Sequence, residues 1–78
     1  MQELQNQSFG QKAVGFSFNP GGDPQVNAIK EQYAVIIDML NSLRNVSTEL
    51  EVKRMYSIAI TESQTAQMWA VKAATWQI

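Results

Sequence analysis

The sequence offers few side chains of the kinds that catalyse reactions. It contains no histidine, the commonest general base, and no cysteine, the strongest common nucleophile. The polar run from Thr61 to Thr65 (TESQT) holds hydroxyl groups, but no lysine or histidine is spaced to activate them. We therefore predict no catalytic residue, and we interpret this run as a wet groove or a hydrogen-bonded interface.

Metal and phosphate-loop chemistry is also poorly supported. Without cysteine and histidine the common zinc sites are excluded, and no acidic cluster has the spacing of a calcium-binding loop. The segment Gly10–Gly15 (GQKAVG) lacks the complete phosphate-loop pattern and has no strand before it. We predict no metal and no cofactor, and we interpret this segment as a flexible tether that carries a lysine.

The segment Phe16–Asp23 (FSFNPGGD) is the best candidate for a ligand loop. Aromatic rings stack on nucleobases, and glycines let backbone amides approach a ligand closely. A helix start favours an anion nearby, and Lys30 follows two turns into the expected helix. Two interpretations stay open from the residues alone. The phenylalanines form a ligand platform, or they cover the helices while Lys30 is solvated.

The element that must position Lys30 is a helix expected over residues 24–45. Asp23 suits the N-cap, and Pro24 suits the first helical position because its missing N–H would be unpaired there. Apolar side chains follow at steps of three and four and predict one buried stripe, formed by Val26, Ile29, Tyr33, Ile36, Leu40 and Leu43.

A second helix is expected over residues 48–77. Thr48 and Glu51 have the spacing of a capping box, and neither glycine nor proline follows. The connection between the two helices is short, which predicts that they run antiparallel. The fold class is therefore all-α: an antiparallel helical hairpin in a single domain, residues 1–78, with residues 1–23 as an N-terminal arm or short helix that includes the ligand loop.

The second helix is apolar over more of its circumference than one partner helix covers. One stripe consists of small residues, and another of Met55, Ile58, Trp69 and Trp76, which we interpret as core or subunit interface. A chain of 78 residues without disulfides buries little surface alone. We therefore expect the hairpin to assemble into a homo-oligomer. The small residues are Ala59, Ser63, Ala66, Ala70 and Ala73.

Charge and hydropathy exclude some partners. A formal net charge of −1 gives no basic surface for duplex nucleic acid, although one or two lysines suffice for a small anion. No apolar run is long enough to cross a bilayer, so no membrane partner is expected. The polar first residues lack the pattern of a signal peptide, which favours a cytoplasmic location.

Several short motifs, in this order and at this spacing over residues 9–76, resemble the phage anti-CBASS sponge family, whose hairpin domain is shared with phage anti-Thoeris sponges. The motifs are FNP at 18–20, GDP at 22–24, AIK at 28–30, SIAIT at 57–61 and MWA at 68–70. The resemblance implies a protein that binds and sequesters cyclic di- or trinucleotides such as 3′,3′-cGAMP without cleaving them. It thereby implies a block of CBASS-type antiviral signalling in the cytoplasm of the infected bacterial host, and a homohexamer.

The resemblance also implies roles for individual residues. Phe18 lies where the family stacks an aromatic ring on a base, often a tyrosine, so that only stacking remains here. Lys30 matches the basic residue that contacts phosphate, with Asn19, Pro20 and Tyr33 completing the ligand site. A further site for trinucleotides is expected near Thr61, Glu62 and Gln64.

Two other functions remain as alternatives. The first is an oligomeric helical adaptor that binds a host protein through the tryptophan stripe. The second is an enzyme acting on cyclic nucleotides, which the lack of catalytic side chains disfavours.

Overall fold

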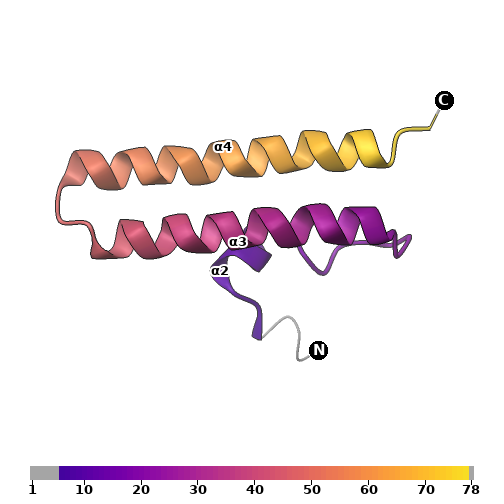
Figure 1. The fold of residues 1–78 in the computed structure, drawn as a ribbon, viewed down its shortest axis with the longest axis horizontal. Helices are drawn as coiled ribbons and strands as arrows, with labels where there is room; N and C mark the ends of the chain where they lie inside the picture. The colour runs from indigo at the N-terminus through magenta and orange to yellow at the C-terminus, as the bar shows by residue number, and fades with distance from the viewer. Residues whose placement is uncertain (1–5, 78) are drawn as a thin grey trace.

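A computed structural model describes residues 6–77, which form helices and connecting turns without any strand. A short helix α2 (Phe9–Ala13) precedes two long helices, α3 (Pro24–Val46) and α4 (Leu50–Ala74). The long helices lie side by side and antiparallel, and α2 packs against α3 (Figure 1). The predicted all-helical hairpin is confirmed. The antiparallel arrangement places the start of α3 beside the end of α4.

The start of α3 follows the sequence prediction. An oxygen of the Asp23 side chain accepts a hydrogen bond from the Gln25 backbone N–H at 2.9 Å, and Pro24 is the first helical residue. This cap satisfies one of the backbone donors that every helix start leaves unpaired. The helix ends at Val46, where the backbone N–H of Ser47 bonds the carbonyls of Leu43 and Arg44.

The start of α4 differs from the prediction, because the capping box expected from Thr48 and Glu51 is not formed. The N-cap is Glu49, and among the described residues no side chain caps this end. The Glu51 carboxylate instead accepts two hydrogen bonds from Arg54, at 3.1 and 2.7 Å, so it is turned away from the helix start. The helix also ends at Ala74, three residues before the expected end at 77.

The segment interpreted as a flexible tether forms α2 and is held firmly, so that interpretation is wrong. Ser8 and Gln11 form a capping box at its start. Gly10 is buried, and its backbone N–H donates to the Asp38 carboxylate at 2.7 Å. A Cβ atom at Gly10 would lie 2.1 Å from the Ala34 carbonyl oxygen. The absence of a side chain is therefore what lets α2 approach α3 so closely.

The buried face of α3 is rotated relative to the predicted stripe. Ile36 and Leu43 are exposed, whereas Lys30 and Ala34 are buried. The reason is that the arm packs against one flank of α3 while α4 packs against the next, so the face between them is the covered one. The core cluster consists of Val14, Ala34, Ile37 and Ile60.

The molecule is one helix layer thick, with principal extents of 46, 31 and 12 Å. A stable domain usually packs two layers around its core. Within residues 6–77, no helix is long and apolar enough to cross a membrane. Large apolar side chains remain exposed on both long helices and just beyond α4, among them Val35, Ile36, Met39 and Leu43 of α3, Met55, Ile58, Met68 and Trp69 of α4, and Trp76 after its end.

Candidate ligand site

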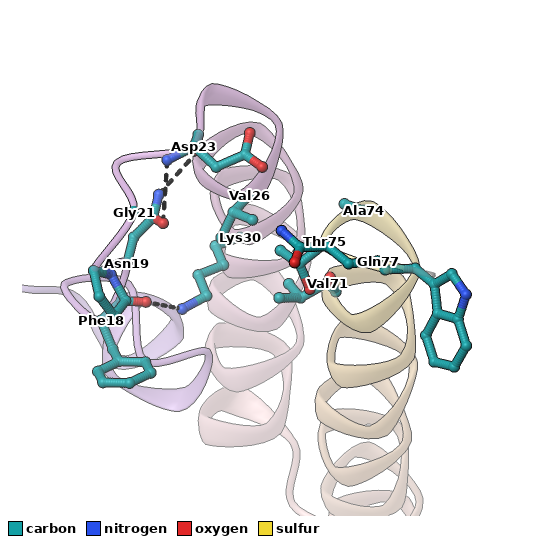
Figure 2. A pocket seen from close by; sticks show the side chains of 12 residues that line it. Phe18, Asn19, Gly21, Asp23, Val26, Lys30, Val71, Ala74, Thr75 and Gln77 are labelled. Atoms are coloured by element: carbon teal, nitrogen blue, oxygen red, sulfur yellow. Dashed lines mark hydrogen bonds between the residues drawn. The ribbon is translucent and has the colours of Figure 1, made fainter.

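The loop between α2 and α3 is built on two glycines and one asparagine. Gly15 and Gly22 have φ angles of 62° and 63°, a region that side chains disfavour. The Asn19 amide donates to the Asp23 carbonyl and to the Asn27 side chain, both at 2.9 Å, and accepts from the Asp23 N–H at 3.3 Å. Asn19 therefore fixes the loop to the start of α3 (Figure 2).

Lys30 anchors the same loop from the side of α3. Its ammonium donates to the carbonyl oxygen of Gly15 at 2.9 Å and to that of Phe18. The residue is only 5% exposed, so the interpretation of a solvated lysine is wrong. Burial lowers the pKa of the Lys30 side chain, since the charged form loses hydration. An ammonium has three N–H groups, and these two carbonyls occupy two of them.

Phe18 is held in the open by this anchoring. Its main chain is fixed by Lys30, while the residue as a whole is 72% exposed. The Lys30 ammonium lies 5.6 Å from the centroid of the Phe18 ring, within the range of a cation–π contact. An exposed aromatic face and a positive charge are thus combined at one place.

A first groove of about 500 Å³ lies at the open end of the hairpin, between this loop and the end of α4. Figure 2 shows Lys30 reaching across to the main chain of Phe18, with Val71 of α4 and Thr75, just after the end of α4, on the other side of Lys30. The groove is lined on the loop side by Phe18, Asn19, Pro20, Gly21 and Asp23, and on the other side by Val26 and Lys30 of α3, Val71 and Ala74 of α4, and Thr75, Trp76 and Gln77 after the end of α4.

A second groove of about 600 Å³ runs between the arm and α4. Phe18, Lys30 and Val71 border both grooves. Gln64 ties the two walls together, because its side-chain amide donates to the Ala13 carbonyl at 3.0 Å. The other polar side chains of the second groove are Lys12, Thr61, Thr65 and Gln67.

The structure brings most of the predicted site residues together. Phe18, Asn19, Pro20 and Lys30 line the first groove, and Thr61 and Gln64 line the second, which shares Phe18 and Lys30 with the first. The two expected sites are therefore neighbours rather than separate places on the chain.

Two predicted residues lie elsewhere. Tyr33 is half-buried against the core cluster and lines neither groove. Glu62 is exposed and is also absent from both grooves. Glu62 follows Thr61 directly, and successive residues of a helix point about 100° apart, so the two side chains face different sides.

Sequence reasoning missed the contribution of the end of α4. Ala74, Thr75 and Gln77 form the wall of the first groove opposite the loop. The predicted antiparallel pairing could have indicated this wall, because it places the end of the second helix beside the start of the first. Combined with the position of Lys30, that pairing points to these residues.

The chemistry of the two grooves suits an aromatic, anionic ligand. Phe18 offers a stacking face, Lys30 and Lys12 offer positive charge, and amides and hydroxyls offer hydrogen bonds. Residues 6–77 contain no group of three His, Cys, Asp or Glu side chains that could hold a metal ion.

Comparison with known proteins agrees with this reading. The family model described as "Acb2/Tad1, hairpin domain" matches residues 11–75, which include both grooves except for Trp76 and Gln77. No curated protein and no solved structure matches the chain.

Proposed function

Because the chain belongs to the Acb2/Tad1 hairpin-domain family, the family of phage anti-CBASS and anti-Thoeris sponges, we propose that it binds and sequesters cyclic di- or trinucleotides such as 3′,3′-cGAMP without cleaving them. This family consists of sponge-type binding proteins rather than enzymes. By removing the messenger in the infected bacterial host, the protein would block CBASS-type antiviral signalling.

The pairing of Phe18 with Lys30 is the observation that carries the proposal. A cyclic dinucleotide has two bases and two phosphate charges. Phe18 presents an exposed ring for one base, and the Lys30 ammonium lies 5.6 Å from the centroid of that ring. Grooves of about 500 and 600 Å³ are within the size range of sites that bind small molecules. Two copies of the chain would supply both rings and both charges.

Self-association, with a hexamer as the expected assembly, is part of the proposal. It is supported by the single helix layer and by the apolar side chains that this layer leaves exposed. Such a surface is large for a protein that remains a monomer. Paired Phe18 and Lys30 side chains would then lie where subunits meet.

One experiment tests the function directly. The purified protein is incubated with 3′,3′-cGAMP, freed of unbound nucleotide and denatured by heat, and the released nucleotide is analysed by chromatography and mass spectrometry. Recovery of intact nucleotide in stoichiometric amount is the expected result. A cleaved product would identify an enzyme instead, and no recovered nucleotide would contradict the sponge.

The tryptophan stripe favours one alternative, an oligomeric helical adaptor that binds a host protein. Trp69 and Trp76 are 66% and 63% exposed, and aromatic side chains of this kind are enriched at protein interfaces. The adaptor predicts that no cyclic nucleotide is retained in the experiment above.

A further inference from the structure

Gln67 of α4 is a largely buried glutamine whose side-chain amide reaches the second groove. The residue is 5% exposed, and within residues 6–77 the side-chain polar atom that is fully shielded without a partner is Nε2 of Gln7, so the amide of Gln67 still reaches water. An amide that bonds water rather than a described protein group is available to a ligand that displaces this water.

The surroundings of Gln67 show where that ligand binds. Gln67 lines the second groove, which it shares with Phe18 and Lys30. Gln64, one turn earlier on the same helix, also lines this groove, but its amide N–H₂ is already engaged by the Ala13 carbonyl. Gln67 is thus the glutamine of the groove that keeps both its donor and its acceptor available.

We infer that Gln67 hydrogen-bonds the edge of a purine base stacked on Phe18 in the second groove, an assignment that rests on the proposed function. A glutamine amide has a donor and an acceptor side by side. Adenine presents a matching pair at N6–H and N7, and guanine presents one at N1–H and O6. By rotating through 180° the amide can serve either base, which suits a cyclic dinucleotide that contains one of each.

The test replaces Gln67 by glutamate and compares cyclic di-AMP with cyclic di-GMP by calorimetric titration. A carboxylate offers two acceptors, so it matches the N1–H and N2–H₂ donors of guanine but cannot donate to N7 of adenine. In Gln67→Glu we expect the ratio of the two dissociation constants to move toward guanine by roughly tenfold or more. We compare the ratio rather than either dissociation constant alone, because the added negative charge weakens the binding of both anionic ligands alike.

Gln32→Glu is the matched control, because Gln32 is exposed on α3 and lines neither groove. It should leave the ratio within about twofold of the unchanged protein, well below the tenfold discrimination that a base contact gives. If Gln67→Glu leaves the ratio unchanged while the unchanged protein binds both nucleotides, the role of Gln67 is wrong and the sponge stands. If the unchanged protein binds neither of these nucleotides nor 3′,3′-cGAMP, both proposals fail.

A second measurement does not depend on the variant folding. In the ¹⁵N NMR spectrum of the unchanged protein, addition of cyclic di-AMP should shift the side-chain N–H₂ signals of Gln67 strongly. The signals of Gln32 should stay in place. Equal shifts, or no shift at Gln67, would overturn the inference.

Discussion

Lys30 holds its charge where water has little access, and two backbone carbonyls replace part of the lost hydration. Burying a charge is unfavourable unless it is hydrogen-bonded, and the carbonyls of Gly15 and Phe18 meet that need. The same bonds fix the main chain of Phe18 while its ring stays exposed. Ordering the loop before the ligand arrives lowers the entropy that binding must overcome.

Replacing Phe18 by alanine should weaken binding of 3′,3′-cGAMP by about 1–3 kcal/mol per stacked base, measured by calorimetric titration. The loss is expected because the ring supplies the stacking face and little of the fold, being 72% exposed. Phe9→Ala is the matched control, since Phe9 lines neither groove. Unchanged affinity in Phe18→Ala would remove this residue from the site.

Ligand affinity should fall at alkaline pH within a window that lies below 10.5, the ordinary pKa of a lysine side chain. Burial lowers the pKa of Lys30 in the free protein, whereas a bound phosphate would hold the proton and raise the pKa again. Binding above the lowered pKa therefore requires proton uptake and becomes weaker as the pH rises. Calorimetry in two buffers of different ionisation enthalpy measures that uptake.

The pH effect on binding can be separated from unfolding. In that window an unfolded chain, with its ordinary lysine pKa, binds more protons than the folded protein at Lys30. The Lys30 contribution to the free energy of unfolding therefore rises with pH there. The Lys12→Gln variant removes the other lysine of the second groove, so it should keep the same fall in ligand affinity as the pH rises. A flat affinity up to pH 10.5 would contradict a phosphate contact by Lys30.

At the scale of elements, the short helix α2 determines the shape of the second groove. It is placed by the close approach of Gly10 to α3 and by the bond from Gln64 to the Ala13 carbonyl. A helix of five residues is not stable alone, so these contacts must hold it. The second groove therefore keeps its shape only while α2 stays packed against α3.

Gly10→Ala tests this docking. The new methyl group would meet the backbone of Ala34, which cannot move aside without bending α3. We expect a loss of roughly 1–3 kcal/mol in the free energy of unfolding, as for other overpacked sites, measured by urea denaturation. Gly21→Ala is the control, because nothing lies within 4 Å of the added atom. Equal stability in both variants would mean that α2 does not dock as described.

The two helix starts give a second matched pair. Asp23→Ala removes a cap that accepts a hydrogen bond at 2.9 Å and should lower the free energy of unfolding by about 0.5–2 kcal/mol. Thr48→Ala should change it by less than about 0.5 kcal/mol, because Thr48 is exposed and precedes an uncapped helix start. Thermal unfolding followed by circular dichroism compares the two variants. A larger loss of stability in Thr48→Ala than in Asp23→Ala would support the predicted capping box at Thr48.

The sequence was sufficient to predict the helices, but it was insufficient to predict which face of each helix is buried. Asp23 and Pro24 act locally, so the start of α3 could be predicted correctly. The burial of Lys30 and the exposure of Ile36 depend on where the arm docks, and that contact joins residues 28 apart in the chain, Gly10 and Asp38. Periodicity describes one helix and its amphipathic stripe, and it carries no information on such a contact.

The candidate site could be predicted only in part, for the same reason. Phe18 and Lys30 could be found because a resemblance and a local motif pointed to them. Gln67 could not, because in the sequence it is one of three glutamines within residues 48–77. Its burial and its place in the second groove distinguish it.

At the scale of the whole molecule, the hairpin is more extended than its length requires. The radius of gyration of the Cα atoms is 13.7 Å, whereas a compact domain of this length has about 11.5 Å. A single layer of helices explains the difference, since α3 is covered only by the arm and α4, and no second layer packs on the hairpin within residues 6–77. The exposed apolar residues of α3 and α4 are then available to other copies of the chain.

Trp69→Arg should disrupt the proposed assembly. Sedimentation velocity should show a smaller particle, and both the melting temperature and the affinity for 3′,3′-cGAMP should fall, because subunit junctions would complete the ligand site. Asn45→Arg adds the same charge at an exposed polar position and should leave all three unchanged. An unaltered particle size in Trp69→Arg would exclude Trp69 from the subunit contact.

The turn between α3 and α4 lies at the opposite end of the hairpin from the loop that borders the first groove (Figure 1). It consists of exposed or half-buried polar residues, from Ser47 to Glu49, and exposed turns of this kind accept insertions most readily. A fluorescent reporter domain could therefore be inserted there without covering the first groove. If the chain binds cyclic nucleotides as proposed, such a fusion would serve as a labelled capture reagent for them.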